Sequence, residues 1–178
     1  MKTQRSRILP LSLALLLPFA VSAQEAAAPT ESVASPVTVE LGDFNTMREL
    51  KHLHGKQRTD TEGAIKRLAS WLSKRATLRI GAGQTLKVTL IDVDLAGDYE
   101  PSAGIDMDHV RVVREMYPPR IELSWRLTDA KGASVDEGQT TLTNMSFLSA
   151  SGPASGRQLA YEMRMLNDWL RERFPKKA

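Results

Sequence analysis

The alternation of apolar and polar residues predicts the strands of this chain. Over 121–128 every second residue is apolar, which is typical of a strand with one buried side and one solvent-facing side. A turn over 129–132 and the segment 133–142 predict that this strand continues into a hairpin. Three earlier strands are predicted, over 37–41, 85–95 and 109–113. Within 85–95 the apolar positions change parity, which indicates either a β-bulge or a strand buried on both faces.

Apolar residues that recur every three or four positions predict two amphipathic helices. The first is expected to begin near Thr59, where Thr59 and Glu62 fit a capping box, and to run to about residue 76. The second is expected over about 157–174, directly before a proline that cannot continue a helix. Segment 46–54 is predicted to be a loop with one helical turn, because its periodic stretch is short.

The order of these elements is β-α-β-β-β-β-α, and short links between the later strands favour antiparallel pairing. We therefore predict an α+β fold: a two-layer sandwich with a mainly antiparallel sheet of four to five strands and two helices packed on one face. This single domain is expected over 37–175. Residues 24–36 are rich in Ala, Ser, Pro and Glu without periodicity, so we expect them to form a flexible tether.

The first 23 residues have the three parts of a secretory signal peptide. Three basic residues occur within the first seven positions, 8–21 is apolar, and a small-residue site precedes Gln24. The apolar stretch is interrupted by two prolines and is shorter than the roughly 20 residues that a spanning helix needs. We expect cleavage after Ala23, a periplasmic location and no transmembrane segment in the mature chain.

Charge and composition narrow the possible functions. The chain has 24 Lys and Arg against 21 Asp and Glu, and the leader accounts for the whole basic excess, so nothing indicates a nucleic-acid partner. The absence of cysteine excludes thiolate catalysis, disulfides and cysteine-ligated metals. No nucleophile motif is present, and Gly81-Ala82-Gly83 lacks the remainder of a dinucleotide or phosphate-binding fingerprint. We expect no cofactor.

Acidic residues gather in one segment, where no Lys or Arg occurs between Lys87 and Arg111. They are Asp92, Asp94, Asp98, Glu100, Asp106 and Asp108. Carboxylate oxygens suit a hard cation, but the calcium-loop spacing fails, because Ala96 and Ala103 stand where a ligand and a bidentate Glu are required. Solvated acids are the simplest interpretation. As the alternative, Asp92, Asp94, Asp98 and Glu100 are the candidate ligands of a metal-assisted hydrolase or calcium-binding module.

Basic residues gather earlier: segment 51–79 holds eight bases against two acids. Those on the outer face of the first predicted helix are Lys66, Arg67 and Lys74. They are either a solvated helix face or a surface that contacts an envelope protein. The neighbouring His52 and His54 would chelate a metal from a strand, but they lie in a loop-like stretch, so we expect no metal there.

Several separated motifs agree in order and spacing with a known family. They are Gly83-Gln84-Thr85-Leu86-Lys87-Val88, Asp92-Val93-Asp94-Leu95-Ala96-Gly97-Asp98, Pro119-Arg120-Ile121, Tyr161-Glu162 and Met165-Leu166-Asn167-Asp168-Trp169. The chain resembles domain-of-unknown-function family 3016, small exported bacterial proteins, over roughly 36–175. The resemblance implies a secreted single domain and supplies no catalytic residues. We therefore expect a non-catalytic accessory or binding protein of the cell envelope.

Overall fold

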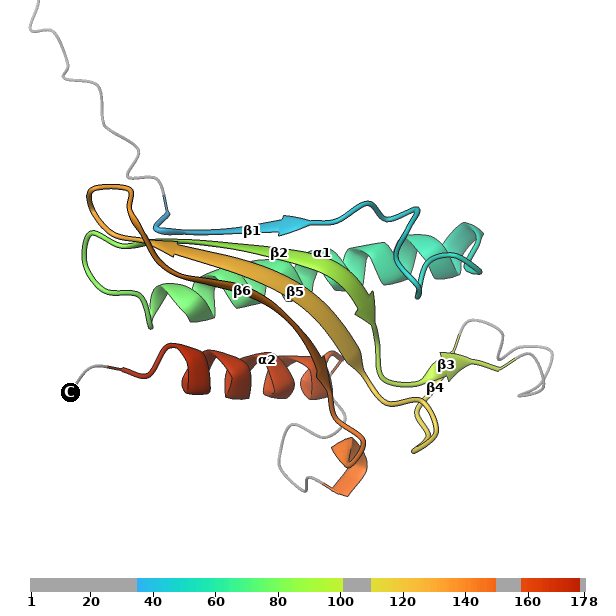
Figure 1. Ribbon diagram of the computed structural model, residues 1–178. Helices are drawn as coiled ribbons and strands as arrows, with labels where there is room; N and C mark the ends of the chain where they lie inside the picture. The colour runs from blue at the N-terminus through green and yellow to red at the C-terminus, as the bar shows by residue number, and fades with distance from the viewer. Residues whose placement is uncertain (1–34, 101–109, 150–157, 177–178) are drawn as a thin grey trace, which may run out of the picture. The chain divides into compact units, whose positions relative to one another are not determined.

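The computed structural model describes residues 35–100, 110–149 and 158–176 (Figure 1). The chain divides into Met1–Val33 and Ala34–Ala178, and every described residue lies in the second unit. The predicted leader, most of the predicted tether, Asp106, Asp108, His109 and most of the predicted loop over 149–156 lie outside the described residues.

The fold is α+β, as predicted. In chain order the elements are β1 (Val37–Leu41), α1 (Gly55–Thr77), β2 (Thr85–Asp94), β3 (Asp98–Tyr99), β4 (Arg111–Val112), β5 (Arg120–Thr128), β6 (Ser134–Thr143), a 3₁₀ turn at Phe147–Ser149, and α2 (Ala160–Arg173). No helix among the described residues is both long enough and apolar enough to cross a membrane.

Four strands form the main sheet in the order β1-β2-β5-β6. β5 pairs antiparallel with both of its neighbours, whereas β1 pairs parallel with β2 because α1 returns the chain between them. The register shifts between Leu90 and Asp92, so the change of parity seen in the sequence is a bulge. The predicted sheet of mainly antiparallel strands is confirmed, with one parallel edge.

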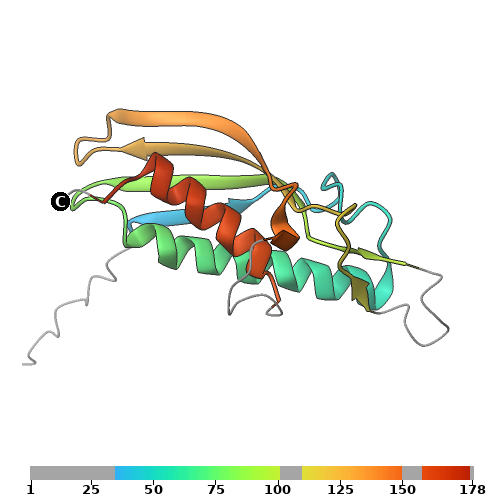
Figure 2. The same cartoon turned by 90° about the horizontal axis from the view of Figure 1, so that it is seen from below.

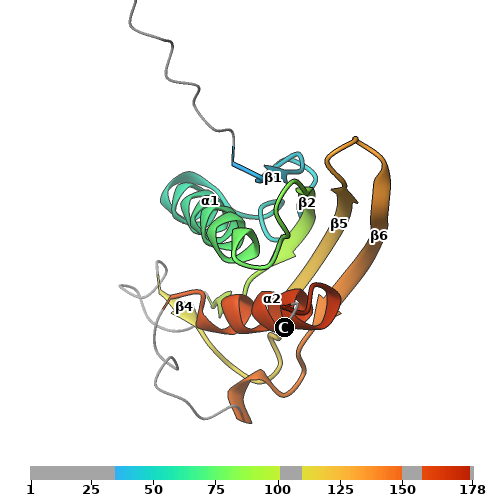
Figure 3. The same ribbon diagram turned by 90° about the vertical axis from the view of Figure 1, so that its left-hand side faces the viewer.

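Both helices cover the same face of the sheet, which curves around them (Figures 2 and 3). The alternating residues predicted to be buried in β5 are buried against them. The helices contribute the other half of the core, chiefly through Ile65, Leu68, Leu72, Leu166 and Leu170. The opposite face carries cross-strand ion pairs, such as Lys87 with Glu40 at 2.8 Å, so it faces water.

A small two-stranded ribbon, β3 with β4, stands apart from the main sheet. The strand predicted over 109–113 is therefore not a member of that sheet, and part of the predicted acidic loop forms its partner. Gly97 makes the turn into the ribbon with φ +85°, and a Cβ there would lie 2.6 Å from the Val112 carbonyl oxygen. Only glycine fits this turn without strain.

The first helix begins one turn earlier than its predicted capping box. His54 is the N-cap residue, and Thr59 lies in the second turn, where its hydroxyl donates to the Gly55 carbonyl at 3.1 Å. The prediction of a capping box at Thr59 was wrong because that residue's backbone is already helical. The extra turn brings the start of α1 beside the β3–β4 ribbon (Figure 2).

Candidate functional site

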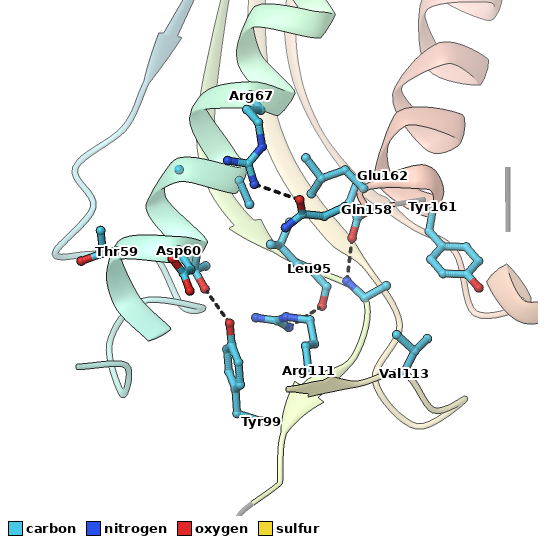
Figure 4. A pocket seen from close by; sticks show the side chains of 15 residues that line it. Thr59, Asp60, Arg67, Leu95, Tyr99, Arg111, Val113, Gln158, Tyr161 and Glu162 are labelled. Atoms are coloured by element: carbon cyan, nitrogen blue, oxygen red, sulfur yellow. Dashed lines mark hydrogen bonds between the residues drawn. The ribbon is translucent and has the colours of Figure 1, made fainter. Parts of the chain in front are cut away.

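A pocket of about 750 Å³ lies between the first half of α1, the start of α2 and the β3–β4 ribbon (Figure 4). α1 contributes Thr59, Asp60, Thr61, Gly63, Ala64 and Arg67. The other walls are Leu95, Ala96, Tyr99, Arg111, Val113, Gln158, Leu159, Tyr161 and Glu162. The pocket combines apolar surface with a few charged and hydrogen-bonding groups, which is the usual make-up of a ligand site.

Glu162, in the first turn of α2, forms part of the pocket's buried wall. Only 2% of the residue is exposed, and its Oε1 accepts a hydrogen bond from the Ala96 backbone N–H at 2.7 Å. Burial raises the pKa of this carboxyl, and the hydrogen bond from Ala96 only partly offsets that effect. Glu162 therefore ties α2 to the bend that follows β2.

Arg111, from β4, holds the same bend from the other side. Its Nη1 donates to the carbonyl oxygens of Gly97 at 2.5 Å and Leu95 at 3.4 Å, and its Nη2 pairs with Glu49. The guanidinium also lies 4.8 Å from the centre of the Tyr99 ring. Through these contacts the Arg111 side chain positions the pocket wall and holds Tyr99 at the edge of the pocket.

Glu49, in the loop between β1 and α1, is the buried partner of Arg111. Its side chain is 6% exposed, and its Oε2 accepts a hydrogen bond from the Leu95 N–H at 3.0 Å. Burial raises the pKa of Glu49 to about 7, against the lowering effect of Arg111, and a hydrogen bond with the Asp94 carboxyl adds to the rise. Two buried carboxylates thus bind the consecutive N–H groups of Leu95 and Ala96.

Glu49 also lines a second pocket, of about 430 Å³, on the other side of the bend. His52, Asp94, Asp98 and Arg120 contribute to its walls. Leu95 belongs to the walls of both pockets, so the two cavities adjoin at this residue.

Polar side chains also line the first pocket, and the exposed Arg67 and Gln158 stand at its rim. Arg67 Nη2 donates to Gln158 Oε1 at 3.0 Å, which links α1 to the residues before α2. Asp60 pairs with Lys56 at 2.5 Å on α1. The hydroxyl groups of Thr61 and Tyr99 lie 3.4 Å apart and join α1 to the ribbon (Figure 4).

The predicted acidic cluster is divided among several roles. Asp92 accepts hydrogen bonds from the Arg48 N–H at 2.8 Å and from Arg120 at 3.3 Å, and Glu100 pairs with Arg114 at 2.8 Å. Their counter-charges therefore come from other parts of the sequence. Asp98 accepts a hydrogen bond from the Tyr99 N–H at 2.7 Å and, like Asp94, lines the second pocket.

A metal at the acidic segment stays a prediction. Among the described residues no group of three or more His, Asp or Glu side chains is arranged to hold one. Of the histidine pair, His52 lines the second pocket and His54 caps α1 without a side-chain hydrogen bond.

The three residues of the predicted basic surface differ in their surroundings. Arg67 lines the first pocket, Lys66 lies 5.4 Å from the centre of the Phe44 ring, and Lys74 is an exposed residue near the end of α1. Only Arg67 of the three contributes to the pocket walls. A protein partner at this surface stays a prediction.

Sequence reasoning missed the residues that build the site: Glu49, Arg111 and Glu162. Glu49 lies in the segment 46–54 that was predicted to be a loop, and Glu162 appears in the sequence analysis only as part of a family motif. Nothing in the sequence pairs Glu49 with Arg111, which is 62 positions away.

The family model "Protein of unknown function (DUF3016)" matches residues 35–172. The chain belongs to this family. The match spans both helices and the main sheet, so the pocket is built from segments inside the DUF3016 region. A comparison with curated proteins finds no match for this DUF3016 member.

The solved structures that are similar to the chain include two of PelC dodecamers from Paraburkholderia phytofirmans. The first, a point variant, is 14% identical to this chain, and the matched region covers 80% of this chain and 86% of the PelC chain, with a TM-score of 0.32. The second is 13% identical, covers 80% and 87%, and has a TM-score of 0.30. Similarity this low carries no argument about the function of the DUF3016 member.

Proposed function

We propose that this protein is an exported, non-catalytic binding protein of the cell envelope, with the pocket between α1, α2 and the β3–β4 ribbon as its ligand site. The observation that carries the proposal is the pocket. Its volume of about 750 Å³ falls within the range of roughly 300–1,000 Å³ that small-molecule sites occupy. Apolar residues from three elements line it, and polar groups stand at its rim.

The chemistry of the walls favours binding over turnover. A general acid or base must be within hydrogen-bonding reach of a substrate proton. Glu162 Oε1 instead binds the Ala96 N–H, and the Arg111 guanidinium is committed to Glu49 and two backbone carbonyls. These charged groups shape the cavity, and the groups left to meet a ligand are those of the rim.

Export is supported by the first 23 residues, which combine a basic start, an apolar stretch and a small-residue cleavage site. The test is to express the full chain with a C-terminal tag in a Gram-negative host and release the periplasm by osmotic shock. We expect the tagged protein in that fraction with Gln24 as its first residue. Full-length protein confined to the cytosol would contradict the proposal.

Ligand binding is tested on the full chain expressed with its leader and purified. Amino acids, sugars, organic acids and nucleotides are screened for an increase in melting temperature, since a ligand at 100 times its Kd stabilises by about 2.7 kcal/mol. Gly63→Phe places a large side chain at the pocket wall, where an added Cβ meets only the flexible Arg67 side chain, at 3.3 Å.

The matched control is Ser70→Phe, two turns further along the same face of α1 and outside the pocket walls. We expect at least one ligand class to raise the melting temperature of the wild type and of Ser70→Phe but not of Gly63→Phe. If no class does so, or if Gly63→Phe responds like the wild type, this pocket is not the ligand site.

A further inference from the structure

Arg67 differs from Asp60 and Arg111, two other charged residues of the first pocket, in having a neutral hydrogen-bond partner. Asp60 is paired with Lys56 at 2.5 Å, and Arg111 is paired with Glu49. The hydrogen bond of Arg67 goes to Gln158, a neutral amide, at 3.0 Å. Among the described residues, Arg67 is therefore the one basic side chain of this pocket without an ion-pair partner.

Glu162 does not supply the missing negative charge. Its carboxyl is buried and hydrogen-bonded to the Ala96 N–H, and burial raises its pKa, which disfavours the ionised form. Among the described residues no ion pair joins Arg67 to Glu162, so the charge of Arg67 stands at the exposed rim, where a ligand would meet it.

The two rim side chains offer donors to an anion. Arg67 carries a planar fork of N–H groups, of which one is used by Gln158. Because Gln158 accepts that bond through its carbonyl oxygen, its amide N–H₂ remains on the same side chain as a second donor. Guanidinium and amide donors together suit the oxygens of a carboxylate or a phosphate.

Apolar side chains also line the pocket and could hold the body of an organic ligand. Leu95, Ala96, Leu159 and Val113 line it together with the Tyr99 ring, which Arg111 holds in place at 4.8 Å. A cavity of about 750 Å³ is far larger than an inorganic ion, whose volume is on the order of that of one or two waters, about 30 Å³ each. The geometry therefore favours an organic anion over free phosphate.

We infer that the pocket binds a small organic anion, with its carboxylate or phosphate on Arg67 and Gln158 and its apolar body against Leu95, Val113 and Tyr99. This inference rests on the proposed function and names the ligand class for the same site. It also gives Arg67 a role different from that of Lys66 and Lys74, for which contact with an envelope protein stays a prediction.

The test uses the purified full chain and four probes: benzoate and phenyl phosphate as organic anions, benzamide as the neutral analogue, and inorganic phosphate. Binding is measured by NMR titration at fixed ionic strength in the wild type, Arg67→Gln and Lys74→Gln. Lys74 is the matched control because it lies two turns beyond Arg67 on the same helix face, carries the same charge and is outside the pocket walls.

We expect benzoate or phenyl phosphate to bind the wild type more tightly than benzamide and inorganic phosphate do. Arg67→Gln should weaken the organic anions by about ten- to a hundred-fold, the usual effect of losing a hydrogen bond to a charged group. Lys74→Gln should change their affinity by less than about two-fold, because an exposed charge outside the site acts only through screened attraction. Arg67→Lys should fall between, since it keeps the charge and loses the fork.

Three results would overturn the inference. The first is benzamide binding as tightly as benzoate, and the second is equal loss in Arg67→Gln and Lys74→Gln, which would indicate general attraction to the helix. The third is the absence of binding by either organic anion. In each case the proposed function still stands if a neutral ligand binds the wild type and Gly63→Phe abolishes that binding. If no ligand binds in this way, the proposed function fails together with the inference.

Discussion

Replacing Glu49 by Gln tests whether burial or the Arg111 ion pair controls this carboxyl. The pKa of Glu49 is about 7 in the folded protein, against an ordinary value of 4.5. Below pH 4.5 the group is protonated in both the folded and the unfolded chain. Between 4.5 and 7 the folded chain holds the proton more tightly, so stability contributed by Glu49 is lost as the pH rises.

The size of this loss follows from the shift. Each pKa unit corresponds to about 1.4 kcal/mol, so ionising Glu49 costs the fold about 3 kcal/mol between pH 4.5 and 8. Glu49→Gln cannot ionise, and its side-chain oxygen still accepts a hydrogen bond from Leu95 or Arg111. Relative to the wild type, the free energy of unfolding of the variant should therefore rise by about 3 kcal/mol over this range, whatever its offset at pH 4.5.

Urea unfolding followed by tryptophan fluorescence, at half-unit steps and constant ionic strength, measures both profiles. The raised pKa of Glu162 contributes to both proteins and cancels in the difference. Glu40→Gln is the control, because Glu40 is exposed and its pair with Lys87 contributes at most about 1 kcal/mol. Parallel profiles for Glu49→Gln and the wild type would show that Arg111 cancels the effect of burial on the pKa of Glu49, and a variant that loses stability relative to the wild type as the pH rises would show that the ion pair outweighs burial.

Three further substitutions probe close packing, backbone strain and a buried carboxyl in this fold. Gly138→Ala should lower the free energy of unfolding by about 1–3 kcal/mol, because the added Cβ would lie 2.8 Å from the buried Trp125 ring. A change below about 0.5 kcal/mol in urea unfolding would mean that the Trp125 ring shifts to make room. Gly97→Ala should cost at least about 1–3 kcal/mol from its positive φ and its clash with the Val112 carbonyl, measured in the same way, and an unchanged midpoint would refute this. Glu162→Gln should gain stability over the wild type as the pH rises from 4.5, since it removes a carboxyl whose pKa is raised by burial; a constant difference between their pH profiles would contradict that cause.

Local pattern was sufficient for most of the fold. The strict alternation in β5 and the helical spacing in α1 and α2 identify the residues that form the core, since each face of these elements is either buried or wet. The start of α1 was misplaced because Thr59 and Glu62 imitate a capping box inside a helix.

The site could not be predicted in the same way. Its walls come from α1, the bend after β2, the β3–β4 ribbon and α2, and its central ion pair joins residues 62 positions apart. Ribbon strands of two residues are too short to show alternation. The acidic segment drew attention because no base lies near it in sequence, but Arg48, Arg114 and Arg120 reach it in space. The hydrophobic pattern indicates which side of a helix or strand is buried, but it gives no information about ion pairs between residues that are far apart in the sequence.

Leu95 belongs to the walls of both cavities. Among the described side chains, Glu49 is the one that accepts a hydrogen bond from the Leu95 backbone N–H. The two cavities therefore share a wall at Leu95. A substitution at Leu95 would therefore alter the walls of both cavities at once.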